Sequence, residues 1–248
     1  MPRENEFERL RVVLVNTRNP LNIGAAARAM SNFGFLHLRV VNPFELAFRE
    51  ARSAVGAAPL LAQAEEFKSL EDAVADCSLV VGTTALSQRD PQHTVHDLQQ
   101  GARLIRKRLT TGCVALLFGS EKRGLSNEDL CHCHWLQRIP TREEHRSMNL
   151  GQAVAVCLYE LARDRKSSLA TEKLELATAG DLERLTSLLL DALHASGYVK
   201  NSQGHAKRRS AAPAKEKVRR LIRRMNLSAA DAELLLGMVR QILWKFRL

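Results

Sequence analysis

Three polar segments, each following an apolar run, carry the side chains best suited to bind a ligand. They are residues 14–29, 114–126 and 139–154, and each contains glycine close to a turn. In a parallel α/β sheet, ligands collect at the carboxyl ends of the strands. All three segments begin at such ends, as does the small-residue turn 83–85. Their convergence predicts one binding site at a single edge of the sheet.

The segment 139–154 also has a purely structural interpretation. Ser147 and Asn149 stand where a helix N-cap would, each able to accept a hydrogen bond from a free backbone N–H. From Leu150 onward, apolar residues recur on one helical face. Gly151 removes a side chain where the first turn could need close backbone approach. A well-capped core helix would explain this segment without any chemistry.

The other two segments leave similar alternatives open. Arg28 lies among four alanines, which favours a role for its charged head group over that of an ordinary surface arginine. Gly119 and Gly124 have the spacing of a phosphate-binding loop, but Leu125 stands where that loop requires lysine. We therefore exclude ATP or GTP binding there and expect either a close ligand contact or a simple turn at Gly119.

The elements that must position these segments alternate along the chain. Strands are predicted at 11–15, 36–41, 79–84, 113–118 and 135–139, and helices at 22–32, 97–108 and 127–130, with further helix within 51–76 and from 150 onward. Gly34 is expected to end the first of these helices. The alternation predicts an α/β fold with a parallel sheet.

The charge is placed unevenly. Residues 1–163 carry 20 basic and 18 acidic residues, whereas residues 164–248 carry 17 and 9. Residues 200–224 alone hold ten basic residues and one acidic residue. Such a segregated block indicates a polyanionic partner, with nucleic acid favoured over an anionic membrane surface. We expect three parts: a domain at 1–163, a linker at 164–180 and a basic helical extension at 181–248.

Cysteine use and hydropathy indicate the compartment. Five cysteines lack the density of a disulfide scaffold, which suits a reducing environment. The run Cys131-His132-Cys133-His134 is spaced too tightly for paired zinc ligands, so we expect no metal. No run approaches 18 apolar residues, and the first residues lack a signal-peptide core. We expect a cytoplasmic protein with no membrane partner.

Taken together, the three segments closely resemble the three motifs of the SPOUT class of methyltransferases, in its TrmH/SpoU family of RNA ribose 2′-O-methyltransferases. The resemblance covers roughly residues 9–163, in order and with plausible spacing. It implies a parallel sheet whose last part is threaded as a trefoil knot, a rare exception to unknotted topology. It also implies S-adenosyl-L-methionine (AdoMet) as cofactor and a homodimer. The tail resembles, more loosely, the C-terminal extension of a bacterial tRNA methyltransferase.

The resemblance assigns roles to individual residues. The catalytic set it implies is Asn22, Arg28, Glu121, Ser147 and Asn149. The cofactor-binding set is Thr83, Thr84, Ala85, Gly119, Ile139, Arg146, Ser147, Met148 and Leu150. Asn22 should act from the helix cap, and Glu121 should orient Arg28 or a neighbouring lysine. Because a guanidinium does not readily lose a proton, we expect Arg28 to bind the target phosphate.

The basic residues are expected to bind the RNA substrate. RNA contacts are expected from Arg18, Arg142, Lys207, Arg208, Arg209, Arg219, Arg220, Arg223 and Arg224. The substrate expected from the resemblance is tRNA, at cytidine or uridine in the first anticodon-loop position, 32. A ribosomal RNA or another tRNA loop is the nearest alternative, and a non-catalytic RNA-binding protein is the alternative of a different class.

Overall fold

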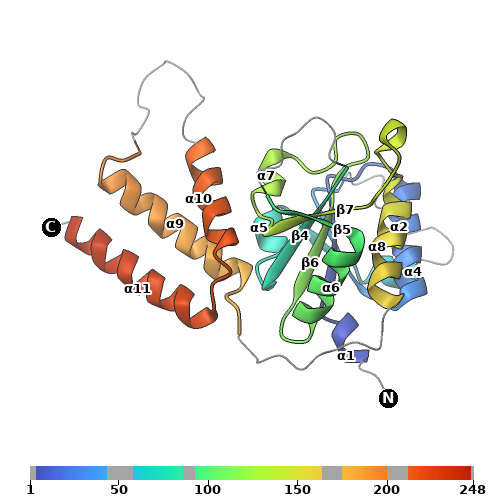
Figure 1. The fold of residues 1–248 in the computed structure, drawn as a ribbon, viewed down its shortest axis with the longest axis horizontal. Coiled ribbons are helices and arrows are strands. Elements are labelled where there is room, and N and C mark those ends of the chain that lie inside the picture. Colours follow the sequence, from blue (N-terminus) through green and yellow to red (C-terminus); the bar gives the residue numbers. More distant parts are fainter. Residues whose placement is uncertain (1–3, 44–57, 86–92, 164–174, 200–211, 247–248) are drawn as a thin grey trace.

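The computed structural model describes residues 4–43, 58–85, 93–163, 175–199 and 212–246. Figure 1 shows a sheet domain beside a group of helices at the C-terminal end. Lys207, Arg208 and Arg209, three of the predicted RNA contacts, lie outside the described residues. Within those ranges, no helix combines the length and apolarity needed to cross a bilayer.

The sheet is parallel throughout its described pairs, as the alternation of elements predicted. Its seven strands are arranged in the order β3-β2-β1-β6-β4-β7-β5. In chain order they are β1 (Leu10–Val15), β2 (His37–Val41), β3 (Glu65–Phe67), β4 (Leu79–Thr84), β5 (Val95–Asp97), β6 (Val114–Phe118) and β7 (Trp135–Arg138). The central strands β1 and β6 and the first half of β4 are nearly all apolar because both faces of the sheet are covered.

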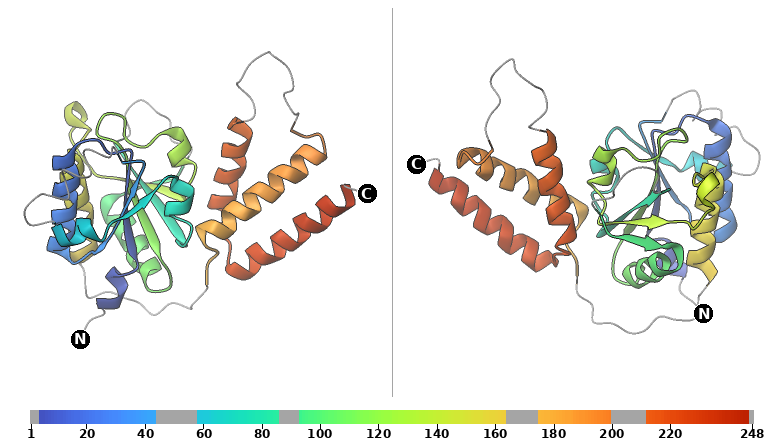
Figure 2. Two further views of the ribbon diagram at one scale, coloured as in Figure 1. Left: turned by 180° about the vertical axis from the view of Figure 1, so that it is seen from behind. Right: turned by 45° about the horizontal axis from the view of Figure 1, so that its top comes forward.

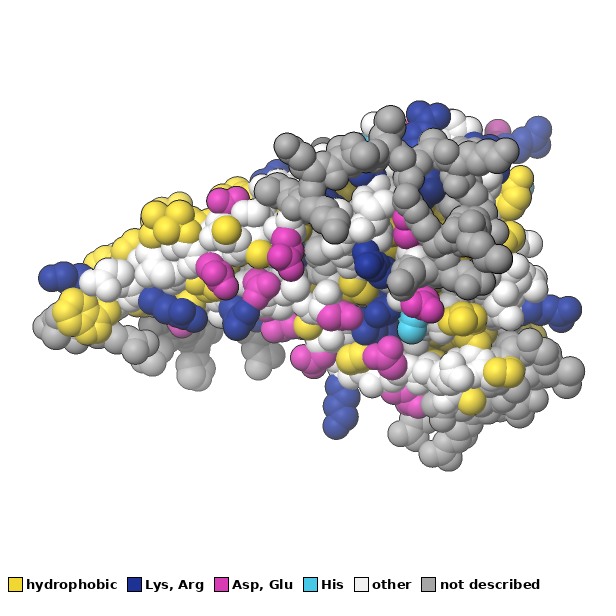
Figure 3. Space-filling model, turned by 90° about the horizontal axis from the view of Figure 1, so that it is seen from below, with side chains coloured by type: hydrophobic (Ala, Val, Ile, Leu, Met, Phe, Trp, Pro, Cys, Tyr) yellow, Lys and Arg dark blue, Asp and Glu magenta, His cyan; other side chains and the backbone are white. Residues whose placement is uncertain are grey.

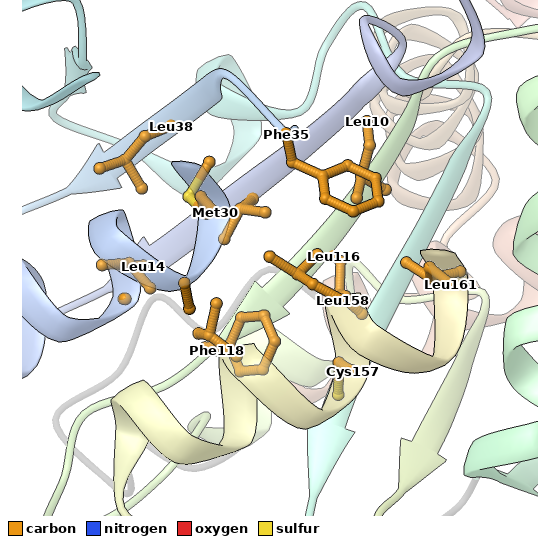
Figure 4. Close-up of a cluster of buried hydrophobic side chains, with 14 of the residues drawn as sticks. Leu10, Leu14, Met30, Phe35, Leu38, Leu116, Phe118, Cys157, Leu158 and Leu161 are labelled. Atoms are coloured by element: carbon orange, nitrogen blue, oxygen red, sulfur yellow. The ribbon is translucent and has the colours of Figure 1, made fainter. Parts of the chain in front are cut away.

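Helices cover both faces of the sheet. The domain contains α1 (Glu4–Phe7), α2 (Pro20–Phe33), α4 (Ala58–Ala62), α5 (Leu70–Ala73), α6 (Leu98–Leu109), α7 (Asn127–Leu130), the 3₁₀ turn η1 (Glu143–His145) and α8 (Leu150–Arg163). On one face, α2, α6 and α8 bury the larger apolar cluster, part of which Figure 4 shows. The other face packs a smaller cluster that includes α5 and the start of the helical extension.

The C-terminal helices form a second core of their own. They are α9 (Ala179–Ala195), α10 (Ala212–Arg224) and α11 (Ala229–Phe246), and their facing leucines and valines are buried against one another. Both views in Figure 2 show them set to one side of the sheet domain. Helix α9 begins at Ala179, inside the segment that the sequence predicted as a linker.

The helix ends follow their sequence signals. Gly34 ends α2 in the left-handed conformation, with φ of 80°, and its N–H reaches the carbonyls of Met30 and Ser31, as predicted. The helix begins earlier than expected, at Pro20, because Asn19 rather than Asn22 is its N-cap. The cap prediction for Asn22 was therefore wrong: proline at the first position already fixes a helical φ, so the helix starts there.

Two strands were not predicted. Strand β3 falls within the segment 51–76 that was expected to be helical, and β5 precedes α6. Both are three residues long and contain charged or polar side chains, so neither has the apolar run that marks a strand in sequence. Each pairs with a single neighbour at an edge of the sheet, and that pairing defines it.

Candidate active site

The chain segments that follow β4, β6 and β7 line one cavity of about 460 Å³. Strands β6, β4 and β7 are neighbours in the sheet, so their carboxyl ends meet at the same edge. All nine residues predicted to bind the cofactor line this cavity, namely Thr83, Thr84, Ala85, Gly119, Ile139, Arg146, Ser147, Met148 and Leu150. The volume lies within the range of pockets for small ligands. The sequence thus identified residues that the fold brings together.

A chain of side-chain hydrogen bonds connects the three predicted segments beside this cavity. The Asn149 amide donates to Asn22 Oδ1 at 2.8 Å, and the Asn22 amide donates to Glu121 Oε1 at 3.1 Å. Asn149 Oδ1 in turn accepts the N–H groups of Gly151 and Gln152, so Asn149 is the N-cap of α8 as predicted. Residues separated by about half the chain therefore hold one another in position.

Glu121 is the ionised centre of this arrangement. Its burial opposes ionisation, but its own backbone N–H, the Asn22 amide and the N–H groups of Asn19 and Arg18 outweigh that effect and lower its pKa. Glu121 lines the cavity, as does the predicted catalytic residue Ser147. Glu121 does not hold Arg28, one of the two cations expected for it, and its oxygens accept hydrogen bonds at the start of α2 instead.

Arg28 lies further along α2 with its side chain exposed. It comes six positions after Asn22 in the helix, which places it ~9 Å further along the helix axis. It makes no hydrogen bond or ion pair with any residue that the structure describes. Neither Arg28, Asn22 nor Asn149 belongs to the described lining of the cavity. The guanidinium of Arg28 is thus available to a molecule that approaches from solvent.

Two glycines permit the close packing of these loops. A Cβ on Gly119 would lie 2.0 Å from the carbonyl carbon of Gly124, because the loop after β6 folds back on itself. The turn interpretation of Gly119 therefore accounts for the residue without a ligand. A Cβ on Gly151 would lie 2.6 Å from Ala25 Cβ, so this glycine lets α8 pack closely on α2, as its position in the first turn suggested.

The cavity also has lining residues that were not predicted to lie there, although Arg220 was among the expected RNA contacts. His93, Lys122, Arg123, Asn127 and Arg220 contribute to its wall. Arg220 comes from α10, so the C-terminal extension reaches the same cavity as the predicted motifs. The basic composition of residues 200–224 drew attention to Arg220, but no local sequence signal connects it with strand ends more than 80 residues earlier.

The basic residues of α10 divide into two groups. Arg219 and Arg223 are only 4% and 1% exposed, and Arg219 donates two hydrogen bonds to Glu183 of α9, at 2.6 and 2.8 Å. Their predicted RNA contacts were wrong, because these guanidinium groups are buried against a carboxylate and against the end of α7. Arg220 is half-buried and Arg224 is exposed. Arg18 and Arg142 are exposed in the sheet domain, as an RNA contact requires.

The run Cys131-His132-Cys133-His134 is buried where α7 meets β7. Burial, with a smaller effect of nearby arginines, lowers the pKa of both histidines to about 3. The Nδ1 atom of His134 accepts a hydrogen bond from the Val80 N–H at 3.0 Å. Both neutral rings pack inside the domain, and His134 is held there by its hydrogen bond to Val80. In the described part of the chain, the residues grouped closely enough to hold a metal are instead Asp76, Cys77 and Cys113.

Comparisons with known proteins fit this geometry. Residues 9–159 match the model of the SpoU rRNA methylase family. The tRNA (cytidine/uridine-2′-O-)-methyltransferase TrmJ of Sodalis glossinidius is 34% identical over 239 residues, covering 94% of this chain and 91% of the relative.

Two solved structures extend the comparison. The crystal structure of TrmJ from Z. mobilis ZM4 has a TM-score of 0.79 and 30% identity, covering 94% of this chain and 98% of that one. An AdoMet-bound rRNA methyltransferase from Sinorhizobium meliloti has a TM-score of 0.50 and 25% identity, covering 64% of this chain and 57% of that one. Because the family model spans well over half of the sequence, this chain belongs to the SpoU rRNA methylase family.

Proposed function

We propose that this protein is an AdoMet-dependent tRNA ribose 2′-O-methyltransferase that acts on cytidine or uridine at anticodon-loop position 32. One observation carries the proposal: the likeness to TrmJ extends through the three C-terminal helices, covering 94% of this chain, rather than ending with the methylase domain. Those helices are the part that would distinguish a tRNA from another RNA, since the family model itself ends at residue 159.

The cavity fits AdoMet by the chemistry of its lining. Leu136, Ile139 and Leu150 provide apolar surface suited to a purine, and Arg146 provides a cation suited to a carboxylate. The small residues Thr83 and Ala85 leave the backbone after β4 accessible to a ligand. When bound, AdoMet supplies a methyl group that its sulfonium centre already activates. The nine predicted cofactor-binding residues would hold it at this strand edge.

The protein's own residues then have a positioning task, because a ribose 2′-hydroxyl is a very weak acid and must be aligned with the methyl group. Asn22 and Asn149, linked to Glu121, fix the three loops relative to one another. Ser147 presents its hydroxyl at the cavity wall, within reach of a nucleotide that enters it. Arg28 binds the phosphate next to the target ribose and stabilises negative charge that develops on the oxygen.

The proposal includes the quaternary and topological properties of the family. The chain following β7 passes through a trefoil knot, and two copies pair through α2 and α8. Support for the pairing comes from large apolar side chains that remain exposed on these helices, Leu21 at 79% and Tyr159 at 53%. The enzyme works in the cytoplasm, on tRNA. Light scattering at micromolar concentration should give a dimer, and a fully active monomer would contradict the pairing.

Two alternatives remain distinguishable. A ribosomal RNA substrate would agree with the description of the family model, and a non-catalytic RNA-binding protein would agree with the fold alone. Calorimetric titration with AdoMet distinguishes the enzyme from a non-catalytic RNA-binding protein, because a protein that only binds RNA should not bind the cofactor. Parallel transfer assays with labelled AdoMet, one on tRNA and one on ribosomal RNA, distinguish the two substrates.

The substitution Arg28→Ala tests the assigned role. Transfer to tRNA should fall at least a hundredfold, while AdoMet affinity stays within a few-fold, because Arg28 lies outside the cavity lining. Arg28→Lys should also fail, since a point charge does not replace a planar bidentate donor. Arg103→Ala, which removes another exposed helical arginine, is the control and should leave transfer unchanged. Loss of AdoMet binding in Arg28→Ala would show that the role is misassigned.

A further inference from the structure

A second cluster of reactive side chains lies at the edge of the sheet opposite to the cavity. Cys77 and Cys113 come just before β4 and β6, and their sulfur atoms are 3.5 Å apart. Asp76 completes the cluster, with one oxygen 3.5 Å from Cys77 Sγ and the other 3.8 Å from Cys113 Sγ. Methyl transfer at the carboxyl ends of the strands does not use these groups.

The strand register brings the two cysteines together. Leu79 pairs with Val114 in the parallel ladder between β4 and β6, and the Ser78 N–H donates to the Cys113 carbonyl at 2.9 Å. The backbone next to each cysteine is therefore held by the hydrogen bonds of the sheet. A disulfide would require the sulfurs to approach from 3.5 Å to about 2.0 Å, a movement that side-chain rotation and a small backbone shift can supply.

The surroundings favour thiolate chemistry over metal binding. Arg39 donates to both carboxylate oxygens of Asp76, at 2.5 and 3.1 Å, and Arg11 Nε lies 3.8 Å from the same carboxylate. A metal cation would have to displace Arg39 and then remain beside two guanidinium groups. The same positive charges stabilise an anionic sulfur.

The two thiols are not equivalent. The hydrogen bond from Cys77 lowers the pKa of Cys113, and Arg11 and Arg39 add to that effect, against the burial of the site and the negative charge of Asp76. The same hydrogen bond, together with burial, raises the pKa of Cys77. Cys113 is half-buried, whereas Cys77 is 0% exposed. Cys113 is therefore the thiol that an external reagent reaches in its reactive form.

We propose that Cys77 and Cys113 form a reversible dithiol–disulfide site that accepts low-molecular-weight disulfides such as oxidised glutathione. The Cys113 thiolate attacks one sulfur of glutathione disulfide, which forms a mixed disulfide and releases one glutathione thiolate. Cys77 then attacks Cys113 Sγ, its proton passes to the departing sulfur, and the second glutathione leaves. The two cysteines are oxidised by two electrons, and one disulfide is reduced to two thiols.

The first turn of α9 is anchored to this site. The Ala179 N–H donates to the Cys77 carbonyl at 2.7 Å, and the Gly180 N–H donates to the Ala75 carbonyl at 2.8 Å. Ala179 is also buried in the same apolar cluster as Cys77. Drawing Cys77 toward Cys113 therefore acts on the backbone that holds the helical extension against the sheet domain, and oxidation should loosen that attachment.

The test uses the full-length protein, reduced and then treated with excess oxidised glutathione. Digestion without reductant and mass spectrometry should yield a peptide pair linked through Cys77 and Cys113, and dithiothreitol should reverse the link. The buried Cys131, Cys133 and Cys157 should stay unmodified. Glutathione retained on Cys113 with no link to Cys77, or no reaction at Cys113, would overturn the proposal.

Variants establish the order of the two steps and the link to α9. Cys77→Ala should leave a lasting glutathione adduct on Cys113, and Cys113→Ser should prevent any reaction. In the oxidised full-length protein, amide exchange at Ala179 and Gly180 should become about tenfold faster, the factor expected for one weakened hydrogen bond. Cys113→Ser serves as the matched control, and its exchange should not respond to the oxidant. A disulfide that leaves both amides unchanged would refute the coupling to α9.

Discussion

The substitution Glu183→Gln removes the negative charge that holds α10 against α9 and the sheet domain. Glu183 is buried, and Arg219 donates to both of its oxygens. Arg223 Nη2 lies 4.0 Å from the same carboxylate, and its Nε and Nη1 atoms have no hydrogen-bond partner in the described part of the chain. The substitution keeps the shape of the side chain and leaves two buried guanidinium groups without their anion.

The expected cost follows from that burial. Removing one partner of a buried ion pair typically destabilises a protein by roughly 3–5 kcal/mol, because the remaining charge stays desolvated. Arg223 is the more vulnerable cation, since burial already lowers its pKa to about 10. We therefore expect Glu183→Gln to lower the free energy of unfolding by about 3 kcal/mol, near the lower end of that range, because the Glu71 carboxylate, 3.9 Å from Arg219 Nη2, still offers that guanidinium an anion.

Urea unfolding measures this effect with two natural reporters. Trp135 lies in β7 and Trp244 in α11, so single-tryptophan variants follow the sheet domain and the extension separately. The midpoint reported by Trp244 should fall the most. Glu233→Gln, at an exposed position on α11, is the matched control and should change stability by less than about 0.5 kcal/mol. A loss below about 1 kcal/mol for Glu183→Gln would refute the idea that this ion pair fastens the extension.

Three further outcomes are expected. Burial lowers the pKa of His134 from 6.5 to about 3, so between these pH values the unfolded chain binds more protons than the folded one. The free energy of unfolding should therefore fall as pH drops below about 6.5, by up to ~2 kcal/mol at pH 5. Urea unfolding of His134→Gln should show a weaker dependence on pH. The new methyl group of Gly151→Ala would clash with Ala25, so this variant should lose about 1–3 kcal/mol of stability and most transfer activity. The control Gly237→Ala, whose Cβ meets nothing within 4 Å, should not be destabilised. Thermal melts of the two variants measure the difference. Arg224→Gln should weaken tRNA binding and flatten the slope of log affinity against log salt by roughly 0.7 to 0.9, measured by filter binding; an unchanged slope would remove Arg224 from the RNA contacts.

Much of the fold could be predicted because its strands are apolar runs that end in turn residues. The five strands named from the sequence all exist, whereas β3 and β5 are defined only by pairing with a neighbouring strand. The shared edge of the site could be predicted for the same reason, because strand ends are visible in sequence and a parallel sheet places them together. The individual cofactor-binding residues came from the family resemblance, and all of them line the cavity at that edge. The link between Asn149 and Asn22 spans most of the domain, and no local pattern reveals it.

Charge was harder to interpret than periodicity. The excess of basic residues predicted RNA contacts from all the arginines of α10, but composition does not say which face of a helix packs inward. Arg219 and Arg223 are buried because Glu183, on a different helix, supplies the opposite charge. On the side of the molecule that Figure 3 shows, basic and acidic side chains are intermixed. Net charge therefore overstated the basic surface of α10.

The most direct test of the proposed function is to map the methyl group that this protein transfers. Purified enzyme, labelled AdoMet and unmodified tRNA should give one 2′-O-methylated cytidine or uridine at position 32, located by nuclease digestion and mass spectrometry. Glu121→Gln should reduce this product sharply, because a neutral amide cannot accept every hydrogen bond that the carboxylate accepts from the start of α2. Methylation of ribosomal RNA in place of tRNA, methylation of a base, or no transfer by a protein that binds AdoMet would contradict the account.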